Sequence, residues 1–333
     1  MTDTARLKEF LSSPRKIVIT THHKPDGDAL GSSLALYMWL KKQNHEVTIV
    51  SPTDYPDFLL WMPNEKEVIN YEKRPNHSVE LIQRADIFFC LDFNKPYRSN
   101  DVGKLIGETK TPKVLIDHHL DPDHFADYEF WNTKACSTAE LVYEFFHQMD
   151  GIKFMDKDIA SCIYAGMLTD TNSFTIPTTT ARVHWIVADL IDAGINHSEI
   201  YGNIYETFTE NKLRLLGFSI TERMEIFNDI STGIICLDGN DLKKFNVGTG
   251  DTEGIVNYPL KMGNVKLAVL IIQRPDQVKL SMRSKGDIDV NKLCHQHFEG
   301  GGHKNAAGGK SNFSVEETKK QLLTILADFF KSN

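Results

Sequence analysis

Hydrophobic positions in the first two hundred residues alternate between two periodicities. Short runs of consecutive apolar and β-branched residues predict buried strands at residues 16–21, 46–50, 86–91 and 113–116. Apolar positions at helical spacing predict amphipathic helices at residues 29–41, 136–148 and 156–169. Because this alternation is typical of parallel sheets between helical layers, we expect an α/β fold with a parallel sheet and helices on both faces.

The hydrophobic pattern changes after about residue 195. Residues 198–226 are polar with helical spacing and predict one or two linking helices. The remaining elements are expected as two strands within residues 224–237, a hairpin over residues 265–273 and 277–283, a helix over residues 289–298, a glycine-rich loop over residues 300–309 and a closing helix over residues 315–331. We therefore predict a catalytic domain (1–195), a helical linker (196–223) and a smaller α/β domain with a mixed sheet (224–333).

Composition and charge argue against a protein that binds long nucleic acid and against one that spans a membrane. The 333 residues carry a formal net charge of -8, whereas binding to long nucleic acid needs a basic face. No apolar run reaches the length of about 18 residues that a membrane span requires. The five cysteines include no CxxC pair, so we expect reduced thiols in a cytoplasmic protein without a membrane partner.

Histidines and aspartates gather where the predicted strands and one helix end. They are His22, His23, Asp26, Asp28, Asp92, Asp117, His118, His119 and Asp170. Because ligands bind beyond the carboxyl ends of parallel strands, these side chains are expected to face one crevice. Carboxylate and imidazole ligands without thiolate suit Mn²⁺, with Mg²⁺ or Co²⁺ as alternatives. Metal ions held in such a crevice suggest a hydrolase.

The order of these motifs resembles the DHH phosphoesterase superfamily. The first motif, HxxPDGDAxGS, begins at His22; a strand-ending Asp92, the DHH triplet at Asp117 and a GxxTDTxxF motif at Gly166 follow. Near the C-terminus, a GGGH run that ends at His303 resembles the loop of the DHH-associated second domain. The resemblance covers nearly the whole chain. Within this superfamily, the chain most resembles the bacterial group of nano-RNases and 3′-phosphoadenosine 5′-phosphate phosphatases.

The resemblance implies a role for each site residue. It assigns His22 and Asp26 to one metal ion, Asp28, His118 and Asp170 to a second, and Asp92 to both. Asp117 would orient the metal ligand His118 without touching the metal itself, and His119 would contact the scissile phosphate beside the catalytic residues Asp92 and His118. In the second domain, the substrate's phosphates would contact Arg283, Ser284, Gly301, Gly302 and His303. The family has one histidine where this chain has His22 and His23, so His23 stays an alternative ligand.

The implied activity is metal-dependent hydrolysis of short RNA oligonucleotides and 3′-phosphoadenosine 5′-phosphate, with cyclic or linear dinucleotides as the alternative substrates. The GGGH run argues against an inorganic pyrophosphatase, and the length leaves no room for the added module of an exonuclease on long DNA. A nucleotide-binding protein without catalysis is disfavoured because the ligand set is complete. The linking helices and the outer helices of the first domain offer surfaces for a homodimer. Five histidines in polar stretches are expected to be exposed: His45, His77, His124, His147 and His197.

Overall fold

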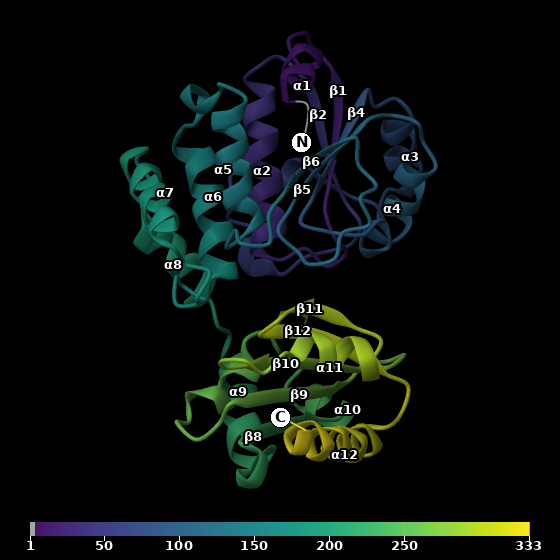
Figure 1. Ribbon diagram of the computed structural model, residues 1–333, viewed down its shortest axis with the longest axis vertical. Helices are drawn as coiled ribbons and strands as arrows, with labels where there is room; N and C mark the ends of the chain where they lie inside the picture. Colours follow the sequence, from purple (N-terminus) through teal and green to yellow (C-terminus); the bar gives the residue numbers. More distant parts are fainter. Residues whose placement is uncertain (1–3, 249, 333) are drawn as a thin grey trace. The chain divides into compact units, whose positions relative to one another are not determined.

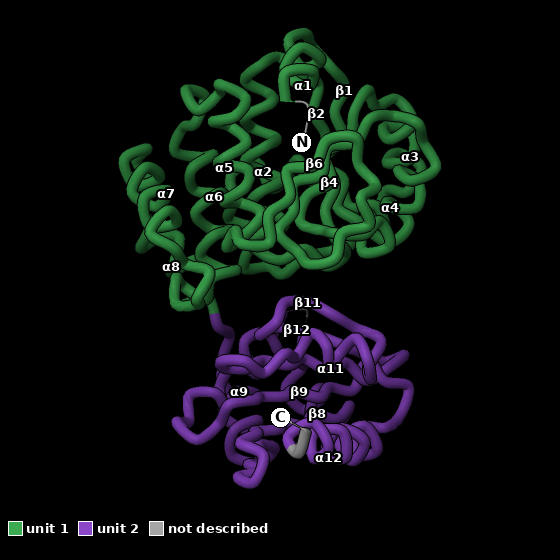
Figure 2. The backbone as a smooth tube through the Cα atoms, in the orientation of Figure 1, with its two compact units in different colours: residues 1–207 green, residues 208–333 purple. Residues whose placement is uncertain are grey.

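The computed structural model describes residues 4–248 and 250–332 and divides the chain into two compact units (Figures 1 and 2). Unit 1 is Met1–Thr207 and unit 2 is Phe208–Asn333. The boundary falls between α8 (His197–Tyr205) and α9 (Glu210–Glu222), within the stretch that the hydrophobic pattern marks as a linker.

Unit 1 is built on a six-stranded parallel sheet, which confirms the predicted fold class. The strands, in spatial order, are β3 (Val68–Asn70), β2 (Glu46–Ser51), β1 (Lys16–Thr20), β4 (Ile87–Leu91), β5 (Lys113–Asp117) and β6 (Tyr128–Trp131). The direction of strand succession reverses between β1 and β4. In open α/β sheets this reversal opens the crevice in which ligands bind.

Helices cover both faces of this sheet because alternate strand residues point to opposite sides. Ile17 and Ile19 pack on one face in a core that they share with α1 (Thr4–Phe10), α2 (Gly27–Lys41), α5 (Thr138–Gln148), α6 (Lys157–Asp170) and α7 (Ala181–Asp192). Val18 packs on the other face against α3 (Pro75–Gln83) and α4 (Asn100–Gly107).

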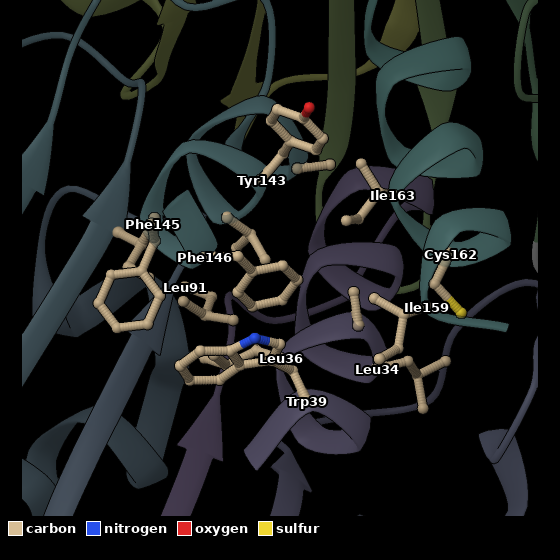
Figure 3. Packing of buried hydrophobic residues seen from close by; sticks show 14 of the residues in the cluster. Leu34, Leu36, Trp39, Leu91, Tyr143, Phe145, Phe146, Ile159, Cys162 and Ile163 are labelled. Atoms are coloured by element: carbon tan, nitrogen blue, oxygen red, sulfur yellow. The ribbon is translucent and has the colours of Figure 1, made fainter. Parts of the chain in front are cut away.

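Helix α2 is fixed firmly within the first of these cores. The Trp39 indole stacks on Phe146 (Figure 3), with ring centroids 4.8 Å apart. Its Nε1 donates to the Gly151 carbonyl. A Cβ atom on Gly31 would lie 2.5 Å from the Cys162 carbonyl oxygen, so only glycine allows α2 and α6 to approach this closely. The N-terminus of α2, which follows β1, is thereby held at the sheet's carboxyl edge.

Unit 2 contains a mixed sheet, also as predicted. Its strands, in spatial order, are β11 (Gly301–His303), β12 (Ala306–Ser311), β10 (Val278–Ser284), β9 (Leu267–Gln273), β8 (Thr232–Leu237) and β7 (Met224–Phe227). Strands β8 and β9 are parallel, and the other neighbours are antiparallel. One face packs against α11 (Val290–His297) and α12 (Val315–Ser332), and the other against α9 and α10 (Gly239–Lys244).

Two local predictions were wrong. The segment expected as a glycine-rich loop instead forms the β11–β12 hairpin. Strand β12 pairs with β10, and its glycines allow neighbouring residues to pack closely against it. A Cβ atom on Gly309 would lie 2.6 Å from that of Phe298. His45 is buried rather than exposed, since its Nδ1 accepts the backbone N–H of Arg15. Among the helices of residues 4–248 and 250–332, none is long and apolar enough to cross a membrane.

Candidate metal centre

The segment after β1 brings His22 and Asp26 to the carboxyl edge of the sheet. Asp26 caps α2, because its Oδ1 accepts the backbone N–H groups of Asp28 and Ala29 at 3.1 Å. His22 Nε2 lies 3.9 Å from Asp26 Oδ1 and 3.5 Å from Asp92 Oδ2. These three side chains offer donor atoms that lie close enough together to hold one cation.

The two adjacent histidines of this segment have different surroundings. His22 is buried, and its Nδ1 donates to the His23 carbonyl at 2.8 Å. Since that nitrogen carries the proton, the Nε2 lone pair of a neutral ring faces the carboxylates, as a metal ligand requires. His23 is exposed, and its Nδ1 donates to the Arg98 carbonyl at 3.1 Å. This geometry favours His22 over His23 as the ligand.

Asp92 follows β4 and lies between two groups of donors. Its backbone has a φ of 64° and its side chain is buried. Oδ2 lies 3.5 Å from His22 Nε2, whereas Oδ1 lies 3.5 Å from His118 Nε2. Asp92 belongs to sets of three side chains that could hold a cation, including one with His22 and Asp26 and one with Asp28 and His118. The two oxygens of the carboxylate therefore face different histidines.

Asp28 and His118 form a second set with Asp92, and Asp170 lies beside this set. Both oxygens of Asp28 accept backbone N–H groups at the start of α5, from Thr138 at 2.6 Å and Ala139 at 2.8 Å. Nε2 of His118 lies 3.8 Å from Asp28 Oδ2 and 3.3 Å from Asp170 Oδ2. Asp170 ends α6, so β4, β5 and the termini of three helices meet at this position.

The DHH triplet differs from the expectation in one respect. Asp117 Oδ1 lies 2.8 Å from the Nδ1 of His119, so Asp117 orients His119 and not His118. The Nδ1 of His118 instead lies 3.4 Å from the Ala135 carbonyl oxygen. The reason is that side chains alternate along the extended chain: Asp117 and His119, two residues apart, share a face that His118 does not.

The carboxylates of the site are crowded in a buried environment. Burial raises the pKa of Asp28 well above its ordinary value, and the charges of Asp92 and Asp170 add to this effect. Burial likewise raises the pKa of Asp170 to about 7. At Asp92 burial acts in the same direction, but hydrogen bonds from His118 and His22 outweigh it and hold the pKa well below its ordinary value. Buried carboxylates in this arrangement fit divalent cations, which neutralise them.

Two contributors to the site were not predicted from the sequence. Thr138 donates its hydroxyl to Asp92 Oδ1 at 2.9 Å, in addition to the backbone bond to Asp28. Arg98 lies on the turn after Asp92, where its carbonyl anchors His23. The start of α5 was detectable, because Ser137 caps the helix and Glu140 follows three residues later.

The predicted substrate contacts of unit 2 lie on its mixed sheet. Arg283 pairs with Ala306, and Ala306 pairs with His303 on the next strand, so Arg283 and His303 share one face. The Ser284 hydroxyl donates to the Ile288 carbonyl, and the Gly302 N–H donates to Asn291 Oδ1 at 2.8 Å. The Ser284 hydroxyl and the Gly302 amide therefore already have hydrogen-bond partners within unit 2.

Known proteins share this arrangement of motifs. Residues 16–167 match the DHH family N-terminal domain, and residues 234–332 match the DHHA1 domain. A Streptococcus mutans protein named probable bifunctional oligoribonuclease and PAP phosphatase NrnA is 30% identical over 305 residues, which are 91% of each chain. The chain belongs to the DHH family. This membership confirms the resemblance and the class of phosphoesterase.

Further known proteins resemble this chain in sequence or in fold. A cyclic-di-AMP phosphodiesterase PdeA of Listeria monocytogenes is 27% identical over 98% of this chain, which spans 49% of the relative. The crystal structure of an exopolyphosphatase-related protein from Bacteroides fragilis superposes with a TM-score of 0.94 at 35% identity, covering 98% of this chain and 96% of that one. RecJ of Thermus thermophilus in complex with Mn²⁺ shares the fold alone, with a TM-score of 0.54 at 13% identity, over 98% of this chain and 54% of RecJ.

Proposed function

We propose that this DHH family member hydrolyses short RNA oligonucleotides and 3′-phosphoadenosine 5′-phosphate with two divalent metal ions. The observation that carries the proposal is the position of Asp92. Its two oxygens face two different histidines, His22 and His118, each within a set of donors for one cation. The name of the Streptococcus mutans relative supports the choice of substrates.

We assign the two cation positions as follows. His22 and Asp26 would hold one ion, and Asp28, His118 and Asp170 the other, with Asp92 shared between them. The donors are carboxylates and imidazoles without thiolate, which suit Mn²⁺. When bound, such ions supply a hydroxide nucleophile near neutral pH and stabilise the charge of the transition state.

The remaining residues of unit 1 position groups around this centre. The backbone N–H groups of Thr138 and Ala139 fix both oxygens of Asp28. Asp117 accepts a hydrogen bond from Nδ1–H of His119, and in the imidazolium form Nε2–H of His119 would donate to the substrate's scissile phosphate. In unit 2, Arg283 and His303 would contact further phosphate oxygens, with Ser284, Gly301 and Gly302 around them.

A phosphate-release assay tests this function directly. We expect Mn²⁺-dependent release of phosphate from 3′-phosphoadenosine 5′-phosphate and of mononucleotides from a diribonucleotide, both abolished by a chelator. His303→Ala should raise KM for both substrates while kcat changes less. Absence of turnover on both substrates with Mn²⁺, Mg²⁺ and Co²⁺ contradicts the proposal.

The second candidate is a cyclic-dinucleotide phosphodiesterase. The Listeria monocytogenes relative carries that name and aligns over nearly all of this chain. Rates on cyclic di-AMP, its linear dinucleotide and 3′-phosphoadenosine 5′-phosphate, measured with the same preparation, separate the candidates. A higher kcat/KM on cyclic di-AMP than on the other two substrates favours the second candidate.

A further inference from the structure

Trp131 is the last residue of β6, the strand at one edge of the unit 1 sheet. Ile116 and Phe130 are paired residues of β5 and β6, and both point into the core that α5 shares. Because successive side chains of a strand point to opposite faces, the next pair, Asp117 and Trp131, points to the other face. Trp131 thus lies beside the DHH triplet at the carboxyl edge of the sheet.

The indole of Trp131 is anchored to the last residue of that triplet. Its Nε1–H donates to the His119 carbonyl at 2.7 Å. The ring also packs against His124, with centroids 6.0 Å apart and an interplanar angle of 82°. The Nδ1 of His124 lies 2.8 Å from Glu129 Oε2, which holds the imidazole in place. The hydrogen bond and the packing fix the indole next to His119 before any substrate binds.

The indole keeps an exposed apolar surface at this position. Among the residues that the structure describes, Trp131 joins neither hydrophobic core of unit 1, and it is 38% exposed. The N–H is the single polar group of an indole, and here it is already bound to the His119 carbonyl. The exposed part is therefore carbon surface, and aromatic rings contribute most when such surface is covered in a core or an interface.

The position of this surface indicates what covers it. Ligands of parallel sheets bind beyond the carboxyl ends of the strands, where Trp131 and His119 both lie. The base and the phosphate of a nucleotide are joined through one ribose, so adjacent contacts for a flat ring and for a phosphate suit a nucleotide.

We propose that Trp131 binds a nucleobase of the substrate by stacking, next to the phosphate that contacts His119. The inference rests on the proposed function, in which His119 contacts the scissile phosphate. Stacking on an aromatic ring tolerates all bases because each has a π face. Trp131 therefore selects nucleotides over phosphate esters that lack a base, and it does not select one base over another.

Binding of AMP and of ribose 5-phosphate to the Mn²⁺-loaded full chain tests the inference without requiring turnover. The two ligands differ by the base, so the ratio of their affinities, measured by calorimetry, isolates the contribution of stacking. We expect the wild type to prefer AMP at least about fivefold, the lower end of what base–aromatic stacking contributes. Trp131→Ala should lose most of this preference. Trp131→Phe, which lacks the N–H and keeps an aromatic ring, should retain part of it.

The matched control is Trp185→Ala, which removes an indole of α7 that is 65% exposed. This variant should prefer AMP like the wild type. An unchanged preference in Trp131→Ala overturns the inference, as does a wild type without preference for AMP. Equal weakening of both ligands in Trp131→Ala also overturns it, because the indole would then act only by positioning His119. If a Trp131-dependent preference exists but no nucleotide is turned over, the proposed reaction is wrong and the stacking site stands.

Discussion

Asp117 accepts a hydrogen bond from His119, with 2.8 Å between Oδ1 and Nδ1. The bond fixes the proton on Nδ1 and directs Nε2 away from Asp117. We predict that Asp117→Asn lowers kcat about 10- to 100-fold, the usual effect of losing such a partner, because an amide can offer the imidazole a donor instead.

The control for this substitution is Asp121→Asn, an exposed position after the triplet where the left-handed backbone also suits asparagine. Steady-state kinetics with saturating Mn²⁺ on 3′-phosphoadenosine 5′-phosphate measures both variants. Wild-type kcat in Asp117→Asn contradicts a positioning role for Asp117.

Thr138 connects the start of α5 to the bridging carboxylate. Its hydroxyl is fully buried and donates to Asp92 Oδ1. Thr138→Val removes this donor and keeps the shape of the side chain. We expect Mn²⁺ affinity to fall about tenfold, since residues that orient ligands have effects of this size. Thr138→Ser retains the hydroxyl and should bind Mn²⁺ like the wild type; equal affinity in all three proteins argues that the bond is dispensable.

Two glycines make a matched test of helix packing. Gly31→Ala places a methyl group against the Cys162 carbonyl and should destabilise unit 1 by about 1–3 kcal/mol. Gly217 lies on an exposed turn of α9 with open space at its Cβ, so Gly217→Ala should stabilise unit 2 by up to about 1 kcal/mol. Calorimetric melting of both variants measures the shifts. A stabilising Gly31→Ala would refute the close approach of α2 and α6.

Unit 2 contains an ion pair between a buried aspartate and a partly exposed arginine, and this pair links the stability of unit 2 to pH. Arg223 donates two hydrogen bonds to Asp241, at 2.8 and 2.9 Å. Burial alone raises the pKa of Asp241, but the bonds from Arg223 and from the Asp238 backbone hold it below its ordinary value of 3.8. The stabilisation is therefore present above pH 3.8 and is lost as the pH falls through the lower folded-state pKa.

We predict that Asp241→Asn removes this acid-dependent part of the stability of unit 2. The free energy of unfolding, measured with urea at several pH values between 6 and 3, should decline less for the variant than for the wild type as the pH falls. If the free energy of unfolding declines equally in the two proteins, the Arg223–Asp241 pair is not the source of the acid dependence. Glu225→Gln, which changes an exposed residue that pairs with Lys319, serves as the control.

The sequence predicted the central strands well because their buried apolar runs are unambiguous. Strands β3 and β6 escaped prediction because they are short and partly exposed at the sheet edges. The β11–β12 hairpin was mistaken for a loop, since glycine and alanine carry little strand preference and the pairing with β10 decides their conformation.

The candidate site was predictable in its residue types and less so in its hydrogen bonds. The proximity of Asp92 and His118 could be predicted, because both follow parallel strands and the topology alone brings the carboxyl ends of β4 and β5 to one edge. The partner of Asp117 and the bond from Thr138 depend on side-chain directions that spacing does not determine. Arg98 was missed because it lies in a turn whose position depends on contacts with Thr21 and His23.

The central claim is that unit 1 holds two divalent ions bridged by Asp92. Electron paramagnetic resonance of the full chain titrated with Mn²⁺ tests it most directly. We predict two bound ions per chain with a spin-coupled spectrum, and loss of the coupled signal together with turnover in Asp92→Ala, whose fold circular dichroism should show intact. Binding of a single uncoupled ion by the wild type, or a coupled spectrum that persists in Asp92→Ala, would contradict the account.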